Sequence, residues 1–310
     1  MVRWLGLIAA LTVAGAGPAL AQTPPADQPG QDPPVSTLDE VIVSGRTLEE
    51  RAETFVDEVA QPVNRRGLAR WARPACFGVV NFSGDAARAI ADQLVARADE
   101  LGLPAGELDC EPNVFIIGAV DGPAVARAWA ARHPGLFQPR VSGTAGRPSD
   151  LRKFVSSDAA VRWWHISLPI DVDMFTGETQ PAVRLPGRGP PIIDVYSRSQ
   201  QASRVRDDLV KVVVLVDVEK LEAITTEQLC DYLLMIAYAQ IDPEGDTADY
   251  DTILNLFEDP TVPGLTDWDR SYLTALYEAD PTRRAGVGAQ GDRLAAELRR
   301  EEPPANPVGP

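Results

Sequence analysis

The sequence predicts an α+β fold, in which a mixed β-sheet is packed with helices and the last third of the chain is helical. Three observations support this prediction. Apolar runs of strand length alternate with amphipathic helical segments over the first half of the chain. A turn-rich stretch then precedes the strongest strand signal, residues 209–218 (LVKVVVLVDV). Only helical patterns follow, so we expect the order βαβαβ, a hairpin and then helices.

The first two expected elements are a helix and a short strand. The helix begins at Leu48 and stops before Pro62, and the strand covers residues 76–82. The apolar residues of this helix share one face: Phe55, Val56 and Val59.

A long helix and a buried strand come next. Ser83 is the expected N-cap of the helix and Gly102 closes it. The apolar face of the helix is formed by Ile90, Leu94 and Leu101. The run at residues 113–119 (NVFIIGA) predicts the strand.

Pro123 lies where the first turn of another helix is expected, and this helix ends near His133. Residues 161–171 (VRWWHISLPID) predict a further strand. Residues 172–208 are rich in turn signals around a short strand at residues 192–196. Three helices are expected in the last third: 226–240, 251–258 and 267–278.

The N-terminus indicates export. Arg3 precedes an apolar run that is short for a membrane span, and Ala19-Leu20-Ala21 forms an A-x-A cleavage signal. We therefore expect residues 1–21 to be a signal peptide, with no integral membrane segment after cleavage. Arginine replaces lysine almost everywhere, a bias that resembles a high-GC bacterial proteome. The expected location is therefore a periplasm.

The flanking segments differ in composition from the rest of the chain. Residues 22–36 are Pro-rich and predict a disordered linker. Residues 48–282 form the expected single globular domain. Residues 283–310 predict an exposed helix, packed through Leu294 and Leu298, and a disordered tail.

The net charge of −16 argues against two classes of partner. Such an acidic surface repels nucleic acid and anionic lipid headgroups, so we expect no nucleic-acid partner. In an oxidising compartment, Cys76 and Cys110 are the plausible disulfide, and Cys230 remains as a buried, inert thiol.

Known catalytic motifs are missing from the sequence, and we predict neither a metal nor a cofactor. The two histidines have ordinary interpretations: His133 lies at a helix C-terminus and His165 lies in a strand. The acidic loop at residues 242–251 has two interpretations, a calcium site or a solvated connection. Its glycine comes too early for an EF-hand, and Ile253 stands where that motif has a bidentate Glu.

If the acidic loop only connects two helices, then Asp249 or Asp251 is expected to cap the second one.

Three segments near the C-terminus carry a family resemblance. They are ITTEQLCDYLLMIAYAQID (224–242), YDTILNLF (250–257) and GLTDWDRSYLTALYEAD (264–280). Together they resemble the end of the matrixin-like (metzincin) zinc proteases. The matching residues of the closing helix are Leu265, Thr266, Asp269, Leu273, Leu276 and Tyr277. The resemblance covers most of residues 65–280, is specific over 226–277, and implies a zincin-like fold.

The zinc ligands of that family are replaced in this chain. Zinc hydrolysis needs two histidines at i and i+4, a third ligand and a Glu that activates water. The resemblance puts Cys230, Leu234 and Gln240 at the ligand positions and Asp231 at the position of the Glu. Leucine cannot bind a metal. The resemblance therefore implies a pseudoprotease without the H-E-x-x-H motif.

We therefore expect a non-catalytic domain that binds an unknown peptide or protein in the former substrate cleft, beside the edge strand. The candidate binding residues come from one strand and from the acidic loop: Trp163, Trp164, His165, Asp242, Glu244 and Asp246.

Two alternatives stay open. One is a hydrolase that uses a carboxylate pair such as Asp171 and Asp173, which alternate on one strand face. The other is an accessory protein of a TonB-dependent system. Residues 37–47 include LDEVIVSGR, which looks like the TonB box of outer-membrane receptors and also suits the first strand of the domain.

Overall fold

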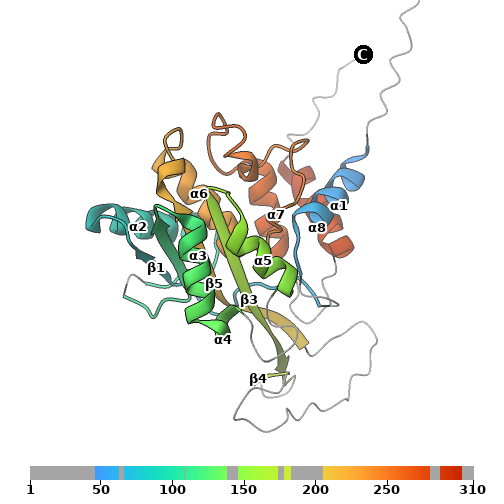
Figure 1. Ribbon diagram of the computed structural model, residues 1–310. Helices are drawn as coiled ribbons and strands as arrows, with labels where there is room; N and C mark the ends of the chain where they lie inside the picture. Colours follow the sequence, from blue (N-terminus) through green and yellow to red (C-terminus); the bar gives the residue numbers. More distant parts are fainter. Residues whose placement is uncertain are drawn as a thin grey trace, which may run out of the picture. The chain divides into compact units, whose positions relative to one another are not determined.

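The computed structural model describes residues 46–62, 66–107, 109–137, 146–173, 178–182, 205–279 and 287–301 (Figure 1). The expected signal peptide and linker lie outside these ranges, as do residues 37–45 of the TonB-box-like segment and the expected short strand at 192–196. Across the described part of the chain, no helix combines the length and the apolar character needed to cross a membrane.

Five strands form one mixed sheet in the order β1-β2-β5-β3-β4. The strands are β1 (Phe77–Val80), β2 (Val114–Ala119), β5 (Val205–Asp217), β3 (Val161–Val172) and β4 (Thr179–Pro181). The first three run parallel, β3 runs antiparallel to β5, and β4 runs antiparallel to β3. The mixed sheet and its helices confirm the expected α+β class.

Helices cover both faces of the sheet (Figure 1). On one face, α2 (Gly84–Glu100) and α6 (Thr226–Tyr238) pack over the alternate valines of β5 in the main core. On the other face lie α3 (Gly122–Arg132), α4 (Pro134–Phe137) and α5 (Pro148–Ser156), which bury a smaller apolar cluster. Because side chains of a strand alternate between the two faces of the sheet, β5 contributes residues to both apolar clusters. Most of its residues are buried.

The first and the last described helices pack together. Helix α1 (Leu48–Val59) lies beside α7 (Asp267–Tyr277) and α8 (Val287–Glu301). The ring of Phe55 contacts the rings of Trp268 and Tyr272 edge to face. Leu294 is fully buried against this cluster and Leu298 packs beside it, as the spacing of the two leucines predicts.

Most expected elements are present, but the helix predicted at residues 251–258 is wrong. Only a 3₁₀ turn, η2 (Ile253–Asn255), forms there. The side chain of Thr252 caps it, in place of the expected Asp249 or Asp251. The buried carboxylate of Asp269 accepts hydrogen bonds from Thr252 Oγ1 and Ile253 N, so that the segment is tied to α7. A second 3₁₀ turn, η1 (Val218–Lys220), follows β5.

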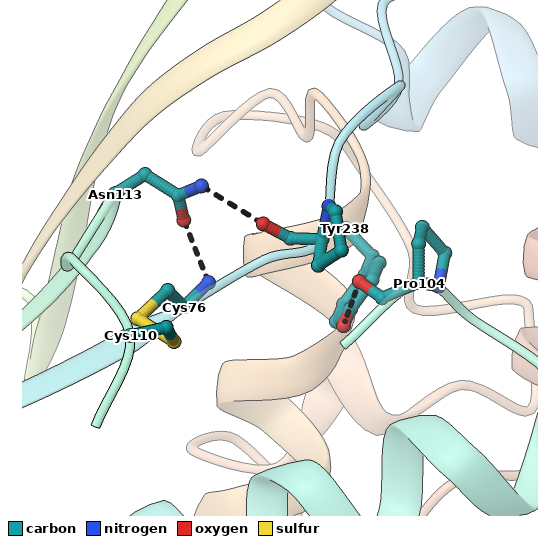
Figure 2. Close-up of a disulfide and its surroundings, with 6 residues drawn as sticks. Cys76, Pro104, Cys110, Asn113 and Tyr238 are labelled. Atoms are coloured by element: carbon teal, nitrogen blue, oxygen red, sulfur yellow. Dashed lines mark hydrogen bonds between the residues drawn. A yellow bond between two sulfur atoms is a disulfide. The ribbon is translucent and has the colours of Figure 1, made fainter. Parts of the chain in front are cut away.

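The predicted disulfide between Cys76 and Cys110 is confirmed (Figure 2). It joins the start of β1 to the loop that precedes β2. Asn113 reinforces this connection, because its Oδ1 accepts from Cys76 N (2.8 Å) and its Nδ2 donates to Pro74 O (3.0 Å). On the other side of the strand, Tyr238 at the end of α6 donates its hydroxyl to Pro104 O (3.1 Å).

Candidate functional site

A cavity of about 1360 Å³ lies beside the first half of β3. Its walls come from α5, from β3, and from the segment between the end of α6 and Val262. All six predicted binding residues line it: Trp163, Trp164, His165, Asp242, Glu244 and Asp246. Segments about 80 residues apart therefore meet at one site, although their role in binding stays a prediction.

The three aromatic residues of β3 do not share one face. Trp163 and His165 point toward the C-terminal end of α6, where Trp163 Nε1 donates to Ile241 O (2.8 Å). His165 Nε2 lies 2.7 Å from Ile236 O, and since a carbonyl only accepts, Nε2 carries the hydrogen. Trp164 points to the opposite face, as the alternation along a strand requires.

Burial makes His165 unsuited to act as a proton acceptor or donor at neutral pH. Only 8% of its surface is exposed, and burial lowers its pKa from 6.5 to about 4, although the bond to Ile236 O opposes the change. Its Nε2 is occupied by the helix carbonyl. The structure therefore favours the structural interpretation of this histidine.

Trp164 contributes a hydrogen-bond donor without an acceptor. The indole packs against Phe137 and Phe154, with ring centroids 5.8 and 6.0 Å away. The residue is 4% exposed, and its Nε1 has no partner among the residues described. A buried N–H without an acceptor costs free energy, and a ligand carbonyl would recover it.

Beside the cavity, the outer edge of β3 is open between residues 161 and 166, where no described strand pairs with it. Farther along, Ser167 O accepts from Arg66 Nη1, Pro169 O accepts from Ala182 N (2.8 Å), and β4 pairs with Ile170, Asp171 and Val172. On the inner edge, Asp217 N donates to Ala160 O (2.8 Å).

That bond sets which residues of β3 face outward. In an antiparallel ladder, hydrogen-bonded pairs alternate with pairs that do not bond. With Ala160 bonded to β5, Arg162 and Trp164 are the next bonded residues. The backbone N–H and C=O groups of Val161, Trp163 and His165 therefore point toward the outer edge.

The opposite wall is the acidic loop, which is held to α1. Asp242 N donates to Val59 O (2.7 Å), and Asp246 N donates to the Glu58 carboxylate (3.2 Å). Gly245 allows this close approach, because a Cβ there would lie 2.3 Å from Glu58 O. The loop is therefore a fixed wall of the cavity.

Acidic side chains outnumber basic ones in the lining of this cavity. Seven carboxylates face three basic residues: Asp150, Asp242, Glu244, Asp246, Asp251, Glu258 and Asp259 against Arg147, Lys153 and Arg162. Arg147 pairs with Asp150, and Lys153 of α5 pairs with Glu244 of the acidic loop. The latter ion pair joins two walls of the cavity.

The four residues that the resemblance puts at the zinc-ligand and Glu positions are buried. Leu234 and Cys230 are fully buried, and burial raises the pKa of the Cys230 thiol to about 12, as expected of an inert thiol. Gln240 Oε1 accepts from Ala69 N (3.0 Å). Asp231 pairs with Arg97 (2.8 Å) and also accepts from Leu265 N.

No cluster of three or more metal-binding side chains occurs within the described ranges.

The alternative catalytic pair lies elsewhere. Asp171 is buried near the end of β3, where it accepts from Gln180 Nε2 (3.3 Å). Asp173 follows the strand, and its N–H donates to Glu178 O. Neither residue lines the cavity. His133 caps the end of α3, as its position before a proline suggests, and its ring is tilted against that of Trp129.

Helix α5 was not predicted from the sequence, and neither were the residues that it contributes to the cavity, chiefly Lys153 and Phe154. A signal for this helix was present: Pro148 stands at its first turn and Leu151 and Phe154 lie three residues apart. Lysine is also scarce, with three in the chain, which marks Lys153 for attention.

No family model, no curated protein and no solved structure matches this chain.

Proposed function

We propose that this chain is an exported, non-catalytic module that binds an extended peptide segment of another protein, in a periplasm. The peptide lies in the cavity and adds a strand to the open edge of β3. The observation that carries this proposal is the coincidence of that open edge with a cavity large enough for a peptide.

Strand addition suits the geometry of this edge. Main-chain hydrogen bonds to an exposed edge provide affinity, and pockets on either side take alternate side chains. Three residues with outward backbone groups, Val161, Trp163 and His165, offer up to six such hydrogen bonds. The indole N–H of Trp164 and the aromatic lining support binding on the second face.

The non-catalytic part of the proposal rests on the residues that replace the zinc ligands. Leu234 cannot ligate, Cys230 is buried, and Asp231 is held by Arg97. We infer that the domain is a degenerate zincin-like fold whose former cleft is kept for binding. The periplasmic location rests on the signal peptide that the sequence predicts at residues 1–21.

The test uses peptides selected by the purified chain from a random decapeptide library. Ala159 is exposed and lines the cavity, so A159W narrows the cavity without disturbing the core. We expect A159W to bind the selected peptides with an affinity at least tenfold lower than that of the wild type in a fluorescence polarisation titration. A89W, on the exposed side of α2, is the matched control and leaves affinity unchanged. Recovery of no peptide, or equal binding to A159W and the wild type, contradicts the proposal.

A further inference from the structure

We propose that the peptide recognised at the β3 edge is basic, and that one of its cationic side chains takes the place of Lys153 beside Glu244. This inference rests on the function proposed above and names the chemistry of the ligand. It follows from three properties of the cavity: the excess of carboxylates, the aromatic wall, and the ion pair that joins α5 to the acidic loop.

The carboxylates are placed to meet a ligand. Glu244, Asp246, Asp251, Glu258 and Asp259 are all exposed while lining the cavity. Like charges gathered on one wall repel one another, and a bound cation relieves this repulsion. An acidic peptide would add to the repulsion, so the charge of the wall selects against it.

The aromatic side chains add a second reason to prefer a cation. Phe257, Tyr232 and Tyr250 line the same cavity as the carboxylates. Guanidinium and ammonium groups bind over aromatic faces, and arginine does so most often. A basic side chain beside this wall would therefore meet both a ring and a carboxylate.

Lys153 already provides such a cation from within the protein. Its Nζ pairs with the Glu244 carboxylate, and the two side chains are 50% and 56% exposed. An exposed pair of this kind contributes about 0–1 kcal/mol, so a ligand cation can displace it at little cost. Lys153 is therefore a competitor of the ligand, and its removal leaves Glu244 free to bind.

The shape of the site distinguishes a peptide from a free polyamine. Both carry positive charge, but only a peptide offers backbone groups to the outward N–H and C=O groups of β3. The five residues from Val161 to His165 span about 17 Å, which corresponds to a peptide of five or six residues. The ligand is thus expected to require an extended backbone as well as charge.

The experiment compares three labelled hexapeptides, with alternating Arg-Val, Gln-Val or Glu-Val, by fluorescence polarisation. We expect the Arg peptide to bind at least tenfold more tightly than the Gln peptide, and the Glu peptide not to bind. K153Q should raise the affinity for the Arg peptide about threefold, and E244Q should lower this affinity about threefold. E222Q removes an exposed charge outside the cavity and is the matched control.

Each other outcome overturns a defined part of the reasoning. If the Gln and Arg peptides bind equally and A159W weakens both, the ligand is not basic, while the proposed peptide-binding function stands. If K153Q leaves the affinity of the Arg peptide unchanged, the exchange at Glu244 is wrong. If spermine binds as tightly as the Arg peptide, strand pairing does not contribute. If no peptide binds, the proposed function fails as well.

Discussion

The buried histidine of β3 should make the stability of the domain depend on pH in a way that H165Q removes. His165 is neutral in the folded chain because burial lowers its pKa to about 4, whereas an exposed imidazole has a pKa of 6.5. In the unfolded chain the imidazole therefore binds a proton more readily. Its protonation favours unfolding as the pH falls below about 6.5.

The size of the effect follows from these two pKa values. Above pH 7 the imidazole is neutral in both states and contributes no pH dependence. At pH 5 the preference of the unfolded chain for the proton is worth about 2 kcal/mol, and it approaches about 3 kcal/mol below pH 4. Glutamine keeps a donor for Ile236 O but does not titrate.

Asp269 opposes this trend, so the wild-type profile alone is uninformative. Burial raises the pKa of this carboxyl from 3.8 to about 6, although four hydrogen bonds from Thr252, Ile253 and Thr266 act in the other direction. The folded chain therefore binds this proton more tightly, which stabilises the fold as the pH falls from about 6 to 4. The useful quantity is the difference between the wild type and H165Q.

The assay is urea unfolding of both proteins at pH 8, 7, 6 and 5. The stability of H165Q relative to the wild type should rise by about 2 kcal/mol between pH 8 and pH 5. H133Q, which replaces the exposed histidine at the end of α3, is the matched control and should follow the wild type. A difference between H165Q and the wild type that stays constant with pH would refute the assignment of a buried neutral imidazole.

Three further predictions concern the fold. D231N should lower the free energy of unfolding by about 2 kcal/mol, because Arg97 and Leu265 N lose a carboxylate; a loss below 0.5 kcal/mol in urea unfolding contradicts this. Reduction of the Cys76–Cys110 bond, which closes a sequence separation of 34, should cost roughly 4 kcal/mol in the same assay, and an unchanged unfolding midpoint argues against it. Cys230 should react with a thiol reagent only after unfolding, and rapid labelling of the native chain excludes its burial.

Local patterns in the sequence were sufficient for the sheet and most helices. The alternation or continuity of apolar residues identified β2, β3 and β5, and caps such as Ser83 marked where helices begin. The predicted helix at residues 251–258 failed for a non-local reason. Asp269, which is distant in sequence, accepts hydrogen bonds from Thr252 and Ile253 and thereby fixes a 3₁₀ turn.

The candidate site was likewise predictable from local patterns in part, while the rest depends on tertiary contacts. Trp163, His165 and the acidic loop could be selected from the sequence, but their proximity depends on how β3 and α6 pack. The period of two along a strand predicts that Trp163 and Trp164 face opposite sides. The ion pair between Lys153 and Glu244 depends on how α5 packs beside the acidic loop. Such tertiary contacts have no local signature.

Pairing of a peptide with the β3 edge is tested most directly by amide hydrogen exchange, measured by NMR with and without a saturating Arg-Val hexapeptide. The amides of Val161, Trp163 and His165 should exchange at least tenfold more slowly with the peptide bound, because they gain acceptors. The amides of Arg162 and Trp164, already bonded to β5, should change little. Bound peptide that leaves all five amides unchanged would contradict strand addition.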